Sequence, residues 1–305
     1  MVLRILYVLS IALFFNVYAF ASAPTSTITV SIINENVKPI SEAKVIGGFS
    51  DNTRGYKQGS GGSGLSNDEG KVTISGPAYY YVDIHVTKEG YYKSKKRVEV
   101  NQVQEHDVSI ILREKRNPVA MYAKKIALGA SGTRKKDKQF GYDLIVGGFV
   151  QPHGEGVTND FFVTHSGFRK DHTHYSYKLT INFSNKDDGV FPFYKEKNLK
   201  LSTFTSDYFV LTDEFKNQWV ITESKKGKNK KKSGNRDPRR NYYFRVRTIK
   251  DKDGNIESAL YGKIYGEFPF ITYYLNPNPN DRNIEFDLKN NLFDGLKNTE
   301  QPLIP

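Results

Sequence analysis

The sequence predicts an all-β fold built as two β-sandwiches in tandem. Tyr and Phe number twenty each, against two Met and one Trp, and aromatic side chains favour the pleated surface of strands. Short runs that alternate apolar and polar residues recur between turn residues, which is the period of a strand with one buried face. The chain has 305 residues. At about 100–200 residues per domain, this length suits two domains.

The first residues have the order of a secretory signal peptide. Arg4 is followed by an apolar run from Ile5 to Phe15 and then by small residues that include Ala21. A charged start, an apolar stretch of about 7–15 residues and an A-x-A-like cleavage site define such a signal. An uncleaved anchor is the alternative, but the run is shorter than the about 20 residues of a spanning helix. We expect residues 1–21 to be removed and no transmembrane segment to remain.

The sequence contains no cysteine. Disulfides, thiolate metal sites and thiol nucleophiles are therefore excluded. A mature chain of about 280 residues buries enough surface to fold without cross-links. This composition favours an exported bacterial envelope protein, periplasmic or extracellular, over a small disulfide-rich extracellular module.

Residues 26–116 are predicted to form the first, smaller sandwich. Residues 28–34 and 80–87 alternate apolar and polar side chains, and Asn, Asp and Gly separate the runs. Strands at this close and regular spacing are typical of a sandwich. The expected strands are 28–34, a strand that ends at 49, 71–76, 80–87, 95–100 and 107–112.

Three motifs in this region resemble the carboxypeptidase regulatory-like family, which consists of transthyretin-like sandwiches of seven strands. The motifs are VKPISEAKV at 37–45, NDEGKVTI at 67–74 and KEGYY at 88–92. Gly70 and Gly90 lie where hairpins need a positive φ, which agrees with the match. Val37 and Glu42 depart from it, because glycine is common at those positions. The resemblance covers residues 26–113 and implies a non-catalytic scaffold module.

Residues 118–276 are predicted to form the second, larger antiparallel sandwich. Pro118 marks the boundary because proline cannot continue a strand ladder. The region resembles, without a defined motif, the β segments of unassigned role that follow such modules in bacterial envelope proteins. Residues 277–305 are rich in Asn and Pro and are expected to form a C-terminal tail. The expected strands are 142–149, 160–165, 175–184, 199–211, 218–223, 242–250, 259–265 and 268–275.

The formal charge of +12 and the pI near 9.4 come largely from one loop. Between Lys225 and Arg240 there are nine Lys and Arg residues and one Asp. Runs of this kind are usually solvated, although basic segments also contact polyanions. Export argues against nucleic acid as the partner. Anionic lipid headgroups, lipopolysaccharide or acidic glycans remain as contacts for this loop.

The sequence lacks the motifs of common enzymes and cofactor sites. No histidine is followed three positions later by Glu, and neither H-E-x-x-H nor G-x-S-x-G occurs. The glycines at 59, 61 and 64 match the letters of a dinucleotide fingerprint, but no βαβ unit surrounds them. Residues 251–257 lack the spacing of a calcium loop and predict a hairpin turn. We therefore expect no enzymatic activity and no cofactor.

His172 and His174 are the candidate metal ligands. Residues i and i+2 of a strand point to the same side, so two imidazoles at this spacing can hold one ion. Asp171, His165 or His153 would have to complete the ligand set. The competing interpretation is an exposed turn before a strand, which needs no metal.

Four aromatic residues are candidates for a binding surface: Tyr79, Tyr81, Trp219 and Tyr242. Such rings stack on sugars or on partner proteins. Adjacent strand residues face opposite sides, so one ring of each Tyr-Tyr pair is also expected at the surface without a function. Packing in the core or across strands is the competing interpretation.

Three functional hypotheses follow from these features. The first is a non-catalytic exported binding or structural protein that engages a protein or surface partner of the bacterial envelope. The second is a carbohydrate-binding protein that uses exposed aromatic rings. The third is a hydrolase, which would require a pocket where His and carboxylate side chains converge.

Overall fold

The computed structural model describes the protein at residues 23–49, 62–101, 104–129, 137–195 and 201–305. These residues form nineteen strands in four sheets and no α-helix. Within them, no helix is long and apolar enough to cross a membrane. The predicted all-β fold of two tandem sandwiches is confirmed. The expected signal peptide and the glycines at 59 and 61 lie outside the described residues.

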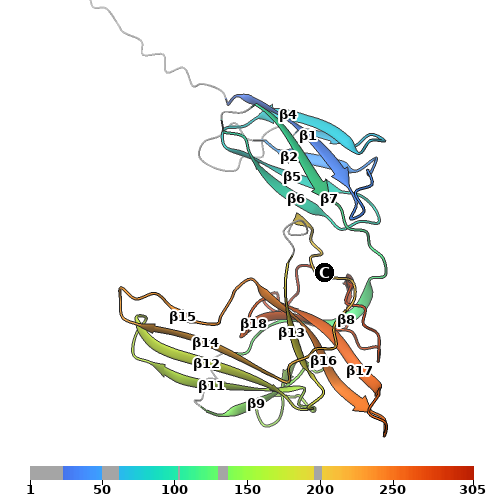
Figure 1. Ribbon diagram of the computed structural model, residues 1–305. Helices are drawn as coiled ribbons and strands as arrows, with labels where there is room; N and C mark the ends of the chain where they lie inside the picture. Colours follow the sequence, from blue (N-terminus) through green and yellow to red (C-terminus); the bar gives the residue numbers. More distant parts are fainter. Residues whose placement is uncertain (1–22, 50–61, 102–103, 130–136, 196–200) are drawn as a thin grey trace, which may run out of the picture.

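The first sandwich consists of seven strands in two sheets (Figure 1). They are β1 (Thr25–Ile33), β2 (Lys44–Gly48), β3 (Ser63–Leu65), β4 (Lys71–Pro77), β5 (Tyr81–Thr87), β6 (Ser94–Glu99) and β7 (Glu105–Ile111). One sheet has the order β4-β1-β7, with β1 and β7 parallel, and the other has the order β3-β2-β5-β6. Ile28, Val30 and Ile32 of β1 alternate into the core and are fully buried, as the period of two predicts.

Among the described residues of the first sandwich, two of the three non-glycine residues with a positive φ lie in its hairpin motifs. Val37 has a φ of 61° and Glu42 a φ of 52°. Glycine takes this conformation without strain, whereas a β-branched residue such as valine rarely does. These are the two positions where the carboxypeptidase regulatory-like pattern commonly has glycine. Gly70 and Gly90, which match that pattern, have φ values of 72° and 77°.

The second sandwich contains the other twelve strands. They are β8 (Val119–Ala127), β9 (Gln139–Asp143), β10 (Gly148–Phe149), β11 (Phe161–Arg169), β12 (His174–Phe183), β13 (Gly189–Tyr194), β14 (Gln218–Lys226), β15 (Ser233–Gly234), β16 (Arg240–Lys250), β17 (Ile256–Tyr265), β18 (Phe270–Leu275) and β19 (Phe286–Asn291). One sheet has the order β10-β9-β11-β12-β14-β15 and the other β13-β16-β17-β18-β8-β19. Their facing side chains, including Leu179, Ile221, Phe244 and Tyr273, form one buried core.

Two segments of this region differ from the expectation. A turn at 144–147 interrupts the run 142–149, because the Asp143 carboxylate accepts hydrogen bonds from the N–H groups of Ile145 and Val146. Residues 277–305 do not leave the sandwich as a tail. They contain β19, which pairs in parallel with β8 and buries Phe286 against Tyr274.

The two sandwiches meet around Arg113, a buried residue that follows β7. Its Nε donates to the Glu35 carboxylate at 2.9 Å, and its Nη1 donates to the carbonyls of Phe204 and Ser206. The guanidinium also lies 4.6 Å from the ring centroids of Phe204 and Tyr208. Groups from both sandwiches therefore converge on one cation.

Residues 201–211, which were predicted as part of a strand, form this joint instead. They make single β-bridges and backbone hydrogen bonds, such as that from the Thr203 N–H to the Lys93 carbonyl. The ring of Phe204 stacks on Tyr92 of the first sandwich at 4.8 Å. The prediction of a strand was wrong here because the aromatic residues of this run fill the joint and do not line a sheet face.

Lys263 of β17 also lies next to Phe204 and is fully buried. Its Nζ donates to the Ser206 hydroxyl at 3.1 Å and lies 4.5 Å from the Phe204 centroid. Burial and the neighbouring charge of Arg113 hold the pKa of Lys263 well below its ordinary value. The joint thus contains a buried arginine and a lysine that burial drives towards the neutral form.

We expect the substitution Arg113→Met to lower the free energy of unfolding by about 3 kcal/mol, as for other broken buried ion pairs. The loss follows because two backbone carbonyls would lose the guanidinium donor and Glu35 would lose its shorter contact to a cation. Urea unfolding followed by circular dichroism measures it. The exposed pair of Lys71 and Glu69 provides the control, since Lys71→Met should change the midpoint little. Equal midpoints for Arg113→Met and the wild type would contradict this role.

Lys263 should make stability depend on pH. With a folded-state pKa below the unfolded one, the unfolded chain binds the additional proton between the two values, so stability rises with pH across that window. The window ends near the ordinary lysine value of about 10.4. Thermal unfolding at several pH values should show a rise for the wild type that is smaller in Lys263→Met. If the unfolding temperatures of the wild type and Lys263→Met changed equally with pH, Lys263 would not be the source of the pH dependence.

Candidate ligand-binding site

The inner face of the sheet containing β11, β12 and β14 continues past the end of the opposite sheet (Figure 1). In its covered part, Leu179 of β12 pairs with Ile221 of β14, and both are fully buried. Two residues farther along the same face, Tyr177 pairs with Glu223, and two beyond that lies Tyr175. These three side chains are half-buried. The sequence of this face thus changes from aliphatic to aromatic and charged where its cover ends.

A cavity of about 570 Å³ occupies this open end of the sandwich. Its volume lies within the range of about 300–1,000 Å³ found for small-molecule sites. It is lined by Gly129, His165, Ser166, Gly167, Phe168, Arg169, His172, Tyr175, Tyr177, Glu223, Lys232, Arg236, Pro269 and Phe270. We refer to it as the open-end pocket.

His165 and Gly167 shape the floor of the pocket. The His165 ring is buried, with Nε2 3.0 Å from the Leu128 carbonyl oxygen and its centroid 5.8 Å from that of Tyr177. Gly167 has a φ of 116°, and a Cβ there would lie 2.1 Å from the Ser176 carbonyl oxygen. Only glycine allows β11 and β12 to approach this closely. The floor is therefore set by the backbone as well as by the rings.

Glu223 is the centre of a charged cluster in the pocket. It accepts hydrogen bonds from the Tyr175 hydroxyl at 2.6 Å and forms ion pairs with Lys232 at 3.2 Å and Arg236 at 3.4 Å. Burial raises the pKa of Glu223, but the donors from Tyr175 and Lys232 outweigh it, so the pKa lies below its usual value. Glu223 is therefore ionised at neutral pH.

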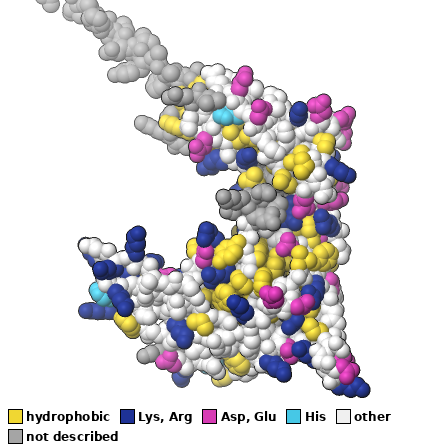
Figure 2. Space-filling view, in the orientation of Figure 1, with side chains coloured by type: hydrophobic (Ala, Val, Ile, Leu, Met, Phe, Trp, Pro, Cys, Tyr) yellow, Lys and Arg dark blue, Asp and Glu magenta, His cyan; other side chains and the backbone are white. Residues whose placement is uncertain are grey.

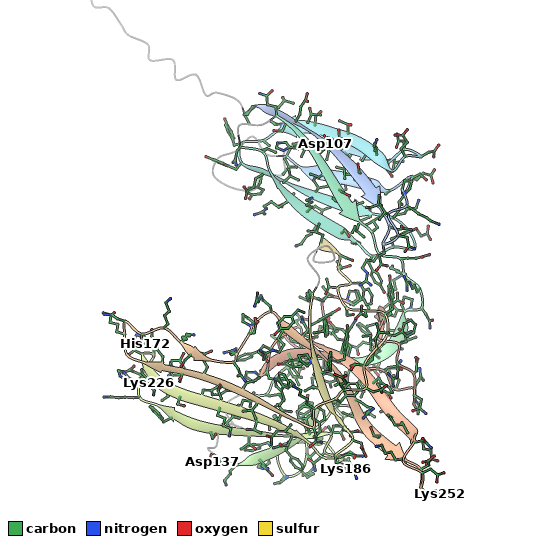
Figure 3. The ribbon with its side chains drawn as sticks, viewed as in Figure 1. Asp107, Asp137, His172, Lys186, Lys226 and Lys252 are labelled. Carbon is green, nitrogen blue, oxygen red and sulfur yellow. The ribbon has the colours of Figure 1, made fainter. Side chains whose placement is uncertain are left out.

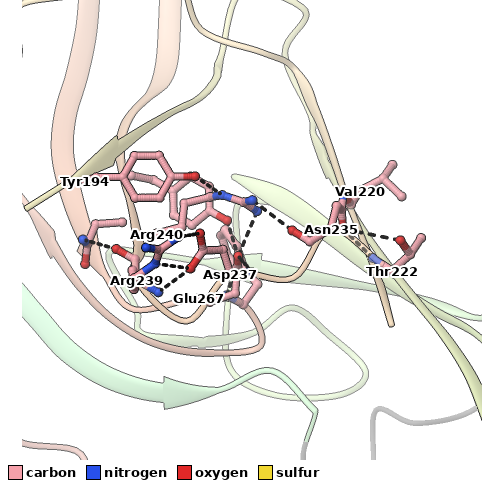
Figure 4. A network of polar contacts seen from close by, with 11 residues as sticks. Tyr194, Val220, Thr222, Asn235, Asp237, Arg239, Arg240 and Glu267 are labelled. Carbon is pink, nitrogen blue, oxygen red and sulfur yellow. Dashed lines mark hydrogen bonds and ion pairs between the residues drawn. The ribbon is translucent and has the colours of Figure 1, made fainter. Parts of the chain in front are cut away.

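A buried carboxylate, Glu267, connects two walls of the pocket (Figure 4). It pairs with Arg240 at 2.9 Å and accepts a short hydrogen bond from the Tyr242 hydroxyl. The Arg240 and Glu267 side chains are 11% and 3% exposed, so water screens this pair little. Glu267 stands just before Pro269 and Phe270, which line one wall. Arg240 ends the basic loop that provides the other.

Asn235 attaches the basic loop to β14. Its Oδ1 accepts from the Thr222 N–H and its Nδ2 donates to the Val220 carbonyl, both at 2.8 Å. The Asn235 carbonyl in turn accepts a hydrogen bond from Arg240 at 2.9 Å. The segment between Glu223 and Arg240 is thus fixed next to the pocket, which places Lys232 and Arg236 at its edge.

The rim of the pocket carries exposed rings and charges. Phe168 is 63% exposed and Phe270 is 56% exposed. Arg169 and His172 are also exposed. Figure 2 shows Lys and Arg side chains gathered at this end of the second sandwich, and Figure 3 places His172 and Lys226 at its tip.

The two candidate metal ligands are not brought together with further ligands. His172 lines the pocket, whereas His174 begins β12 with its Nδ1 3.9 Å from the Asp171 carboxylate. Asp171 mainly closes the turn, since it accepts from the N–H groups of Thr173 and His174. In the part of the chain that the structure describes, no three His, Asp or Glu side chains are grouped as a metal site.

The four aromatic candidates lie outside the lining of the pocket. Tyr242 is fully buried, and Trp219 packs edge-on against it in the core. Tyr79 is half-buried, and Tyr81 lies beneath the guanidinium of Arg97 at 3.8 Å. The rings that line the pocket are Phe168, Tyr175, Tyr177 and Phe270. The signal for Tyr175 and Tyr177 is their spacing of four and two residues from Leu179, which places them on the buried face of β12.

Comparisons with known proteins give no family assignment. No protein-family model matches the chain, and no curated protein matches it. Among solved structures, BcpA, the major pilin subunit of Bacillus cereus, is 12% identical, with 84% of this chain and 96% of that chain covered at a TM-score of 0.23. The shaft pilin SpaA from Lactobacillus rhamnosus GG is 13% identical, with 75% and 89% covered at 0.23. A DUF3823 family protein from Parabacteroides merdae is 10% identical, with 84% and 97% covered at 0.20. TM-scores this low carry no inference about function.

We expect Glu267→Gln to destabilise the second sandwich by roughly 3–5 kcal/mol, because Arg240 would remain buried without a counter-charge. Fluorescence of the single tryptophan reports this transition, since the Arg240 guanidinium lies 5.4 Å from the Trp219 ring. The pair of Asp237 and Arg239 in the same loop is the control, because Arg239 is 79% exposed, and Asp237→Asn should unfold at the same denaturant concentration as the wild type. If the unfolding midpoints of Glu267→Gln and Asp237→Asn both equalled that of the wild type, Glu267 would not hold the pocket walls.

Proposed function

We propose that this protein is a non-catalytic, exported binding protein of the bacterial cell envelope that engages a surface partner through the open-end pocket. The observation that supports this most is the change along one sheet face from buried aliphatic residues to Tyr177, Tyr175 and Glu223. A face that only needed to be soluble could be polar throughout. Rings kept half-exposed beside fixed charges are typical of a site that receives a ligand.

The exposed rings at the rim support the same proposal. Phe168 and Phe270 lie on different sheets of the sandwich, yet both border the same cavity. Large apolar side chains exposed singly are ordinary, but apolar groups gathered around a concave site mark binding surfaces.

Two titratable groups of the pocket, His165 and Glu223, favour binding over catalysis. His165 is engaged with a backbone carbonyl, and Glu223 is engaged with Tyr175, Lys232 and Arg236. A general base needs hydrogen-bond access to its substrate and a nucleophile next to it. The ionised, cation-paired state of Glu223 suits electrostatic recognition better than proton transfer.

Export and domain assignments belong to the proposal as well. Residues 1–21 are proposed to be the signal peptide, residues 26–116 a carboxypeptidase regulatory-like module and residues 118–276 a second module completed by 277–305. The left-handed backbones of Val37 and Glu42 support the first module, because they occur where its pattern commonly has glycine. Carbohydrate is the second candidate for the partner, and the aromatic lining of the pocket favours it.

Binding to the envelope fraction of the organism that carries the gene tests this function. The double substitution Phe168→Ser with Phe270→Ser should weaken binding at least about tenfold, because it removes both rim rings. Leu211→Ser is the matched control, since Leu211 is 76% exposed and does not line the pocket. Sedimentation of the purified protein with envelope material measures the affinity. Unchanged binding by the double variant, or equal loss in the control, would contradict the proposal.

A further inference from the structure

We infer that the open-end pocket binds a carbohydrate that carries carboxylate groups, an oligomer of uronic acid being the simplest case. This inference rests on the proposed binding function and specifies its ligand. It combines two observations on the same cavity: the kind of rings that line it and the arrangement of its charges.

Among the described lining residues, aromatic rings outnumber aliphatic side chains, of which Pro269 is the single case. None of the fourteen lining residues is Val, Leu, Ile or Met, whereas Phe168, Tyr175, Tyr177 and Phe270 contribute rings. A lipid chain or the apolar anchor of a protein partner is best received by a deep aliphatic pocket. The faces of aromatic rings are electronegative and attract the polarised C–H groups on one side of a sugar. The lining therefore suits a molecule with hydrophobic faces and polar edges.

The charged groups of the pocket favour an anion. Arg169, Lys232 and Arg236 line it, against one carboxylate, Glu223. The Lys232 and Arg236 side chains are 65% and 35% exposed, so both retain contact with solvent while they pair with Glu223. An arginine has five N–H donors, and a single hydrogen bond to Glu223 leaves donors on Arg236 for a ligand carboxylate.

Glu223 shows how the pocket can hold a carboxylate. A phenol donor from Tyr175, an ammonium from Lys232 and a guanidinium from Arg236 already surround this group. A ligand carboxylate would use the outward donors of the same two cations. Glu223 then plays two opposing parts: it fixes the cations in place, and it reduces their attraction for a second negative group.

The fold disfavours two other partners. Strand addition by a peptide needs a free edge of useful length, and the edge strand next to the pocket, β15, has two residues. Non-specific adsorption of polyanions would use every lysine of the basic loop alike. Recognition in the pocket would use Lys232 and Arg236 but not Lys228, which is exposed and lies outside the lining.

Calorimetric titration with tetramers of galacturonic acid and of mannuronic acid tests the ligand class. Each is compared with its methyl ester, which keeps the sugar rings and removes the negative charge. We expect at least one acidic tetramer to bind, with its ester at least about tenfold weaker. High salt should weaken binding of the acidic tetramer and leave any binding of the ester unchanged.

Three substitutions locate the binding. Arg236→Gln should weaken binding of the acidic tetramer about tenfold, since the substitution removes a charge-assisted donor. Glu223→Gln should increase the affinity for the acidic tetramer roughly 3- to 10-fold, because it removes the competing negative charge. Glutamine still accepts the hydrogen bond from Tyr175, so the local structure is kept. Lys228→Ser should leave the affinity unchanged. An increase in affinity cannot result from misfolding, so Glu223→Gln keeps the test decisive even if Arg236→Gln is unstable.

The outcomes separate this inference from the proposed function. Absence of binding by both acidic tetramers, or equal binding of acid and ester, would overturn the ligand class. If envelope binding still depended on Phe168 and Phe270, the proposed function would stand without it. Equal weakening by Lys228→Ser and Arg236→Gln would show a diffuse polyanion contact along the loop and would also overturn the inference.

Discussion

The unequal length of two packed sheets is the constraint on which the rest of this structure depends. The inner face of β11, β12 and β14 extends past its cover, so the aliphatic core must end within a sheet. At Leu179 and Ile221 the face is buried, and at Tyr177 and Glu223 it meets solvent. Rings and paired charges tolerate this boundary better than aliphatic side chains, because they combine apolar faces with polar contacts. The pocket is a consequence of that boundary.

An open end of a sandwich would collapse or fray without contacts that connect the segments around it. The ion pair between Glu267 and Arg240 is one such contact, because it joins the segment before Phe270 to the end of the basic loop. Asn235 continues the connection to β14. Most of the excess positive charge of the chain lies in this loop. The structure therefore places part of that charge at the edge of a cavity. The sequence alone indicated only a solvated loop that could contact polyanions.

Local patterns predicted the fold well because strands with one buried face have a period of two. They identified β1, β5 and β12, and the hairpin motifs led to Val37 and Glu42 as unusual positions. They could not identify β3 or β15, which have three and two residues and no apolar alternation. Alternation also says which residues share a face but not where its cover ends. That is why Tyr242 was named as a surface candidate, whereas the structure buries it and opens the pocket at Tyr175 and Tyr177.

The central claim is that the uncovered sheet face is a binding site for an acidic carbohydrate. Backbone amide chemical shifts of the labelled protein, recorded while an acidic uronate tetramer is added, test it most directly. The account predicts saturable shifts at residues 165–177 and 223–236 and at Phe270, with the first sandwich unchanged. Shifts confined to the first sandwich or to the exposed lysines near Lys228, or none at all, would contradict it.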